Sequence, residues 1–254
     1  MDVYGYCGQS AINELADFKD DVNNLEQLDR AMRNAKHKKK DKINYMKLTL
    51  AASVATGLSH IHSVDPLPTL KSSIDEDNNI PPRAKMAHYD INPRNIAVVK
   101  GGKPKINDFN IAEFLYTPKD NNSNNNDTVC GFPSRLHEPW WRAPEEMYIP
   151  PKGEELRKVT EKVDVYALGG VLFHILTTHS PRGKMKRERM ELVREQVARG
   201  ERPILPEPYL SSNSTAVKAF RKAMDRCFVV NPNERGSSHE VASILQEALL
   251  QYNI

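Results

Sequence analysis

The sequence feature that most constrains this chain is an octapeptide, HYDINPRN, at 88–95, which is followed by the tripeptide DFN at 108–110. Three of these residues, Asp90, Asn95 and Asp108, carry carboxylate or amide oxygens, which are the ligands that magnesium prefers. Both peptides adjoin short apolar runs that are typical of strands. A fold that brought the three side chains together would form a site suited to Mg²⁺ and to phosphate chemistry.

A hairpin between the two peptides would bring them together. The apolar runs at 96–100 and 105–106 flank Gly101-Gly102, a pair that favours a tight turn. Folding the chain back at this turn would place Asn95 close to Asp108. Each peptide taken alone also has a plain structural explanation, because Asn-Pro and Asp-Phe-Asn are common turn formers.

The rest of the chain predicts an α+β protein dominated by helix. We expect two short strands around a turn at Gly8 and a polar helix at 23–35. At 44–62, apolar residues three and four apart predict an amphipathic helix. From Val163 onward the pattern is mostly helical, and Ser-x-x-Glu at 237–240 resembles a capping box that opens a last helix. Strands and helices are therefore segregated along the chain, as in α+β proteins.

Composition excludes several classes of protein. The chain has 254 residues, of which 39% are hydrophobic, so it is not disordered over its whole length. A net charge of +3 gives no reason to expect a nucleic-acid partner. The three cysteines lack metal-type spacing and favour a reducing compartment. No signal peptide is visible, and the longest apolar stretch, 165–178, is too short to span a bilayer, so we expect a cytoplasmic chain without a membrane segment.

Five motifs, taken in order, resemble those of the C-terminal lobe of a eukaryotic-type protein kinase. The catalytic loop H-R-D-x-x-x-x-N matches 88–95, D-F-G matches 108–110 and A-P-E matches 143–145. DVYALG at 164–169 resembles the start of the family's central buried helix, and NPNER at 231–235 resembles its late arginine motif. The resemblance covers almost the whole chain and implies a protein-kinase-like fold with a mainly helical C-lobe.

The resemblance implies an active site for ATP and Mg²⁺, with a protein substrate as the acceptor. Asp90 would orient the acceptor hydroxyl and take its proton, while Asn95 and Asp108 would hold the metal ions that bridge the nucleotide phosphates. Arg94 would neutralise the transferring phosphoryl group. His88 would be structural and would pack beneath Asp108.

Three further residues have structural roles in the resemblance. Glu145 would form a buried ion pair with Arg235. Asp164 would accept hydrogen bonds from the backbone of the catalytic loop and so fix its shape. The activation segment would span 108–145.

Several positions depart from the family pattern. Tyr89 stands where the family usually has arginine, so we do not expect regulation through an Arg–phosphoresidue pair. Asn92 replaces the lysine typical of Ser/Thr kinases, and Asn110 replaces a glycine, although asparagine tolerates left-handed backbone. Glu138 is neither the threonine of Ser/Thr kinases nor the proline of tyrosine kinases. The acceptor type is therefore open, and we expect Ser/Thr because that class is the commoner one.

The largest departure concerns the N-terminal lobe. Before the catalytic loop the sequence holds no G-x-G-x-x-G loop, no strand lysine of V-A-I-K type and no glutamate that suits the αC helix. We therefore expect a truncated N-lobe, its last strands and hinge, at 1–18 and a kinase-like C-lobe at 19–254. The residues implied near the adenine are Glu14, Leu15, Ala16 and Ala97.

Two functions fit this sequence. The first is a protein kinase that moves the ATP γ-phosphate to a protein hydroxyl, weakly or not at all in this chain because the charge-stabilising groups of the N-lobe are missing. The alternative is a pseudokinase or a kinase-fold interaction module, which the departures at Tyr89, Asn92 and Asn110 favour. Retention of the three metal-site residues favours the kinase. The sequence does not determine the substrate or the oligomeric state.

Overall fold

The structure is a computed structural model that describes residues 3–7, 10–13, 24–28, 40–63, 84, 86–115, 130–135 and 137–252. Its helices are α2 (Lys40–His62), α3 (Lys162–Thr177), α4 (Met190–Ala198), α5 (Glu207–Leu210), α6 (Thr215–Cys227) and α7 (Ser238–Leu250). Short 3₁₀ helices are η1 (Pro93–Asn95), η2 (Pro139–Trp141), η3 (Pro144–Glu146) and η4 (Arg187–Arg189). The strands are β1 (Val3–Cys7), β2 (Ser10–Asn13), β3 (Met86–Ala87), β4 (Ile96–Val99), β5 (Lys103–Ile106), β6 (Glu113–Phe114), β7 (Phe132–Pro133) and β8 (Lys158–Val159).

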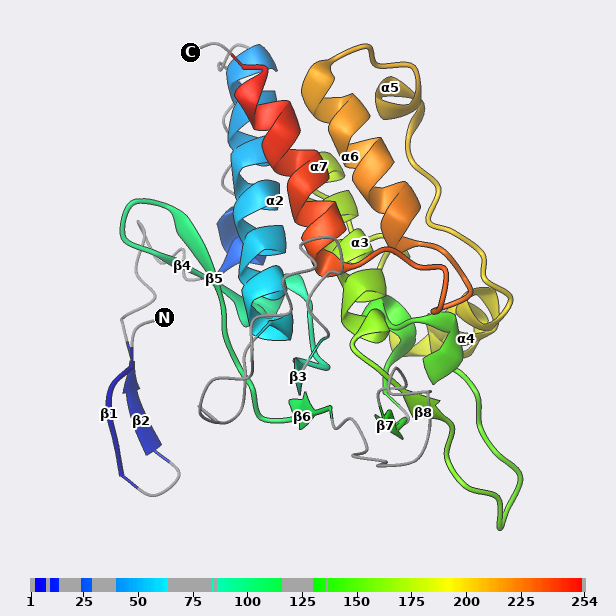
Figure 1. Ribbon diagram of the computed structural model, residues 1–254. Helices are drawn as coiled ribbons and strands as arrows, with labels where there is room; N and C mark the ends of the chain where they lie inside the picture. The colour runs from blue at the N-terminus through cyan, green and yellow to red at the C-terminus, as the bar shows by residue number, and fades with distance from the viewer. Residues whose placement is uncertain are drawn as a thin grey trace, which may run out of the picture.

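Four helices build the core of the described chain. α2 packs against α7, and α6 packs against both α3 and α7 (Figure 1). α3 is buried from Val163 to Thr177, and its mostly apolar sequence suits a helix that is surrounded by protein. Gly169 permits the close approach of α6, because a Cβ atom there would lie 2.7 Å from the Cβ of Cys227. In the part of the chain that the structure describes, no helix is long and apolar enough to cross a membrane.

Several elements predicted from local patterns are confirmed. β1 and β2 form the antiparallel pair expected at the start of the chain. The helix predicted at 44–62 begins earlier, at Lys40. The Ser237 side chain accepts a hydrogen bond from the backbone N–H of Glu240 over 3.1 Å and caps α7, as the Ser-x-x-Glu pattern predicts. Of the polar helix predicted at 23–35, residues 25–28 are helical and residues 29–35 lie outside the described residues.

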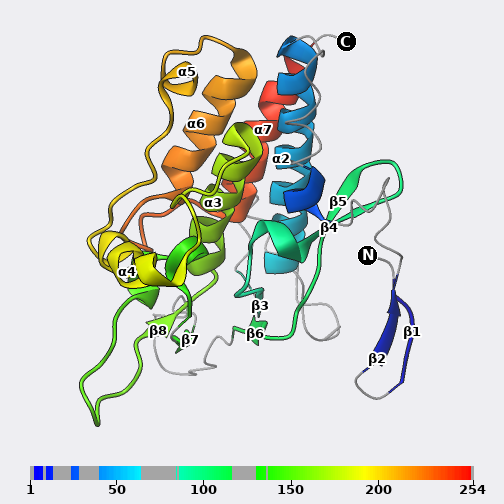
Figure 2. The same cartoon turned by 180° about the vertical axis from the view of Figure 1, so that it is seen from behind.

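Two strand pairs hold the octapeptide and the DFN peptide in place. β4 and β5 form the predicted hairpin, with Ile96 opposite Ile106, and both turn glycines have positive φ. β3 pairs with β6, so Met86 lies opposite Phe114. Seen from behind in Figure 2, β3 and β6 lie below the C-terminal end of α2, and β4 and β5 lie beside that helix. The β3–β6 pair therefore joins the two ends of the segment from 88 to 112, and the β4–β5 hairpin folds its middle.

A buried ion pair joins η3 to the turn before α7. The Arg235 guanidinium has no exposed surface, and its Nη1 and Nη2 atoms lie 2.6 and 2.8 Å from the two carboxylate oxygens of Glu145. Arg235 also donates to the backbone carbonyls of Val229 and Lys162. These contacts compensate the buried charge and fix η3 on the helical core.

We predict that Arg235→Met lowers the free energy of unfolding by about 3–5 kcal/mol, because it leaves the buried Glu145 carboxylate without its partner. Urea denaturation followed by circular dichroism measures this change. The matched control is Arg226→Met in the Arg226–Glu240 pair, whose side chains are 41% and 42% exposed, and whose loss should cost less than about 1 kcal/mol. Equal losses for the two variants would contradict the prediction.

Candidate active site

The carboxylate of Asp164, in the first turn of α3, anchors the octapeptide. It is 1% exposed and accepts the backbone N–H groups of His88 over 2.6 Å and Tyr89 over 2.8 Å. The Nε2 atom of His62 lies 3.1 Å from the same carboxylate, and the other ring nitrogen of His62 lies 2.9 Å from the Ser238 hydroxyl. This network fixes the backbone at Tyr89, where φ is +66°.

His62 was not among the residues predicted for the site, although its position in the sequence suggested a buried role. His62 follows Leu58 by four residues and so falls on the apolar face of the predicted helix. A histidine on a buried face needs a polar partner, and Asp164 supplies it.

His88 links the octapeptide to the DFN peptide. Its Nδ1 accepts the backbone N–H of Asp90 over 3.2 Å, so Nε2 carries the hydrogen and donates to the carbonyl of Asn107 over 3.0 Å. The imidazole also packs edge-on against Phe109, with 4.7 Å between ring centroids. His88 is fully buried, and both ring nitrogens have partners within the fold.

Asp90 and Asn95 contact each other across the turn of η1. Asn95 Nδ2 donates to the Asp90 carbonyl over 2.9 Å and to Asp90 Oδ2 over 2.7 Å, which leaves Asn95 Oδ1 as the atom able to bind a cation. The backbone N–H of Asn107 donates to the Asn95 carbonyl over 2.8 Å, so Asp108 follows directly on a residue bonded to Asn95. Asp108 is exposed and has a φ of +66°. Asn92 caps η1 by accepting the N–H of Arg94.

Tyr89 connects the octapeptide to Phe132, Arg135 and His137. Its hydroxyl accepts the backbone N–H of Arg135 over 2.8 Å, and its ring packs edge-on against Phe132 and His137. Burial raises the pKa of Tyr89, so the phenol stays un-ionised near neutral pH. At the position where the family pattern has a charged arginine, this chain therefore has an uncharged hydroxyl, and that hydroxyl contacts the backbone of Arg135.

Arg142 forms an ion pair with Asp90. No pattern in the sequence indicated this contact. Its Nη2 lies 2.8 Å from Asp90 Oδ1, and its Nη1 donates to the carbonyl of Tyr89. The same Nη1 lies 3.5 Å from Oε1 of Glu146. Both oxygens of the Asp90 carboxylate are thus held, one by Arg142 and the other by Asn95.

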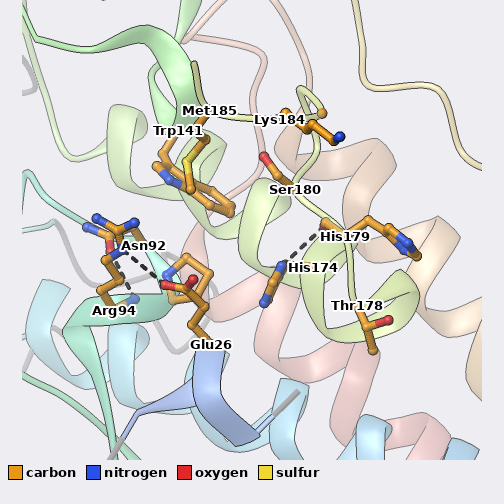
Figure 3. Close-up of a pocket in the computed structure, with 12 residues that line it drawn as sticks. Glu26, Asn92, Arg94, Trp141, His174, Thr178, His179, Ser180, Lys184 and Met185 are labelled. Atoms are coloured by element: carbon orange, nitrogen blue, oxygen red, sulfur yellow. Dashed lines mark hydrogen bonds and ion pairs between the residues drawn. The ribbon is translucent and has the colours of Figure 1, made fainter. Parts of the chain in front are cut away.

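Arg94 lies between two cavities and pairs with another residue. Its Nε atom is 3.0 Å from Oε2 of Glu26, and its side chain is 67% exposed (Figure 3). One cavity, of about 460 Å³, lies between this pair and the Trp141 and His174 rings. The other, of about 390 Å³, is lined by Asp90 and Asn95 and shares Arg94 and Trp141 with the first.

The remaining sequence-derived site residues fall in two groups. Ala97 is buried in β4 and forms an isolated bridge with Asn24. Glu14, Leu15 and Ala16 lie outside the described residues.

Glu146 is the buried carboxyl group below Arg142. It is 2% exposed, and its Oε2 accepts the backbone N–H of Ala143 over 2.7 Å. Desolvation raises the pKa of Glu146 to about 7, and the charge of Arg142 opposes that rise. The charge of Arg142 therefore favours the ionised form of Glu146, against the effect of burial.

We predict that the free energy of unfolding falls by up to about 3 kcal/mol as pH rises from about 4.5 through 7. The folded state binds more protons in this window, because the pKa of Glu146 is about 7 when folded and 4.5 in an ordinary environment. Glu146→Gln should remove this contribution, while Glu154→Gln at an exposed position should keep it. Urea denaturation at about pH 5 and about pH 8 measures the difference. An unchanged pH dependence in Glu146→Gln would contradict the prediction.

Comparisons with known proteins identify the family of this chain. The protein kinase domain family matches residues 78–247. A serine/threonine-protein kinase/receptor of Acanthamoeba polyphaga mimivirus is 28% identical over 204 residues, which cover 80% of this chain and 10% of that protein. Serine/threonine-protein kinase tousled-like 1-B of Danio rerio is 28% identical over 169 residues, covering 65% of this chain and 20% of the relative. The dual specificity protein kinase shkC of Dictyostelium discoideum is 25% identical over 207 residues, covering 81% and 33%. The chain thus spans a tenth to a third of the length of these relatives, and it belongs to the protein kinase domain family.

Proposed function

We propose that this chain contributes the acceptor-binding and metal-binding half of a protein kinase site, which transfers the γ-phosphoryl group of ATP to a protein hydroxyl. The observation that carries the proposal is the fixed carboxylate of Asp90 at the wall of a cavity of about 390 Å³. Arg142 and Asn95 each hold one of its oxygens, and Asp164 holds the backbone beneath it. A carboxylate fixed in this way can orient a hydroxyl and accept its proton.

Mg²⁺ fits the donor set around the octapeptide. Within the described ranges, no group of three or more His, Cys, Asp or Glu side chains could hold a metal ion alone. Mg²⁺ in phosphate-transfer sites commonly takes only one or two carboxylates together with substrate phosphates. Asn95 Oδ1 and the exposed carboxylate of Asp108 would supply those protein ligands. When bound, the ion neutralises charge that develops on the phosphate oxygens.

Arg94 and the N-terminal segment have further proposed roles. Arg94 would reach the phosphoryl group by leaving Glu26, and its high exposure leaves it free to move. The nucleotide base would lie near Glu14, Leu15, Ala16 and Ala97. In this proposal the N-lobe remnant spans 1–18 and the C-lobe spans 19–254. The activation segment within the C-lobe would span 108–145.

The proposed acceptor is serine or threonine. The mimivirus and Danio relatives are named as serine/threonine-protein kinases, and shkC is named as a dual specificity kinase. A cytoplasmic location is proposed with it, supported by the free thiols of Cys130 and Cys227.

A second candidate is an interaction module with a kinase fold. The replacement of the family's glycine by Asn110 and of its lysine by Asn92 favours this candidate. Both positions lie beside the proposed phosphate site, so they bear on activity more than on folding.

Mg-ATP binding and transfer separate the two candidates. We predict that Mg-ATP raises the melting temperature of the chain by several degrees, because a ligand that binds only the folded state stabilises it. Asp108→Asn should lose this rise. Asp90→Asn should keep it and lower transfer to a serine-containing protein by at least about 10²-fold.

Thermal-shift titration and transfer of labelled phosphate measure these quantities, and Lys218→Gln on the exposed face of α6 is the control. No melting shift in the unaltered chain would rule out the nucleotide site and favour the interaction module.

A further inference from the structure

The cation that contacts the candidate catalytic carboxylate comes from the activation segment. We propose that Arg142 is the positioning residue of the acceptor site and that Glu146 is the buried counter-ion that holds it there. The inference rests on the proposed function, because it assumes that Asp90 is the group that meets the acceptor hydroxyl.

Arg142 is held from several sides. Its side chain is 11% exposed, and its two terminal nitrogens contact Asp90 Oδ1 and the Tyr89 carbonyl. Its guanidinium carbon lies 5.3 Å from the centre of the Tyr89 ring, within the range of a cation–π contact. A planar guanidinium suits this arrangement, because its donors point in fixed directions at two acceptors of adjacent residues.

Glu146 supplies a second support for the guanidinium. Its side chain is 1% exposed, and Oε2 is occupied by the N–H of Ala143. Oε1 has no hydrogen-bond partner among the described residues, and the Nη1 atom of Arg142 lies 3.5 Å from it. A buried carboxylate needs a compensating charge, so the pair keeps the guanidinium from turning toward solvent.

The neighbouring candidates are engaged elsewhere. Asn92, which replaces the lysine of the family pattern, uses its side chain to cap η1 and to donate to the Asp90 carbonyl. Arg94 pairs with Glu26. Arg142 is therefore the cation that contacts Asp90. Without it, Asp90 Oδ1 would lose its donor, and the carboxylate could rotate about its last side-chain bond.

Transfer kinetics test the positioning role. Arg142→Met should lower kcat for a serine-containing protein by about 10²-fold, because misplacing a reacting group by roughly 1 Å costs that much. The KM for ATP and the Mg-ATP melting shift should stay unchanged. Arg142→Lys should recover only part of kcat, since an ammonium group cannot reach both acceptors in the same geometry.

Glu146 and a matched arginine complete the kinetic test. Glu146→Gln should lower kcat in the same direction, and it should have no further effect when Arg142 is already Met. Arg135→Met is the control, because that arginine also lies in the activation segment but is 50% exposed and pairs with Glu113. A kcat for Arg142→Met that matches the Arg135→Met value would overturn the inference.

Nuclear magnetic resonance tests the contact itself and does not require activity. The Arg142 guanidinium should rotate slowly about its Nε–Cζ bond in the unaltered chain and faster in Asp90→Asn and in Glu146→Gln. Equal rotation in all three proteins would overturn the inference, even in a chain that binds no nucleotide. Slow rotation in a chain without transfer would refute the proposed function and leave the Arg142 contact established.

Discussion

The buried carboxylate of Asp164 is the interaction on which the rest of the site depends. A charge that is 1% exposed must be hydrogen-bonded, and two of its partners are the backbone amides of His88 and Tyr89. The first turn of α3 therefore sets the path of the octapeptide and sustains the left-handed backbone at Tyr89. His62 extends the network from α2 to Ser238 at the start of α7, so three helices share the task of placing one loop.

Residues near Asp90 that depart from the family pattern contact one another or share a partner. Tyr89 brings an uncharged ring and hydroxyl where an arginine is usual, and the ring packs under the guanidinium of Arg142. Glu146 adds a buried carboxyl group below the same guanidinium. Arg142 thus brings positive charge to Asp90 from a distant part of the chain, whereas Asn92 within the octapeptide shapes the turn. The placement of Asp90 consequently depends on the packing of Arg142 against the octapeptide.

Local patterns in the sequence predicted local structure well. The hairpin around Gly101-Gly102, the helix at 44–62 and the cap at Ser237 each depend on contacts a few residues apart, which spacing and residue type reveal. His62 was missed, although its place on an apolar helix face was visible, because its partner is 102 residues away. The hairpin was expected to bring Asn95 close to the DFN peptide. The structure supports this expectation through one backbone hydrogen bond, from Asn107 to Asn95, next to that peptide.

The amino-acid sequence by itself determined the order of the motifs, the residue types that carry oxygen ligands and the periodicity of the main helices. The tertiary structure decided which charges meet. Arg94 is close to Asp90 in the sequence and pairs with Glu26, whereas Arg142 is 52 residues away and pairs with Asp90. The choice of an ion-pair partner depends on side-chain direction and on the packing of distant segments, and neither is encoded in the spacing of residues along the chain.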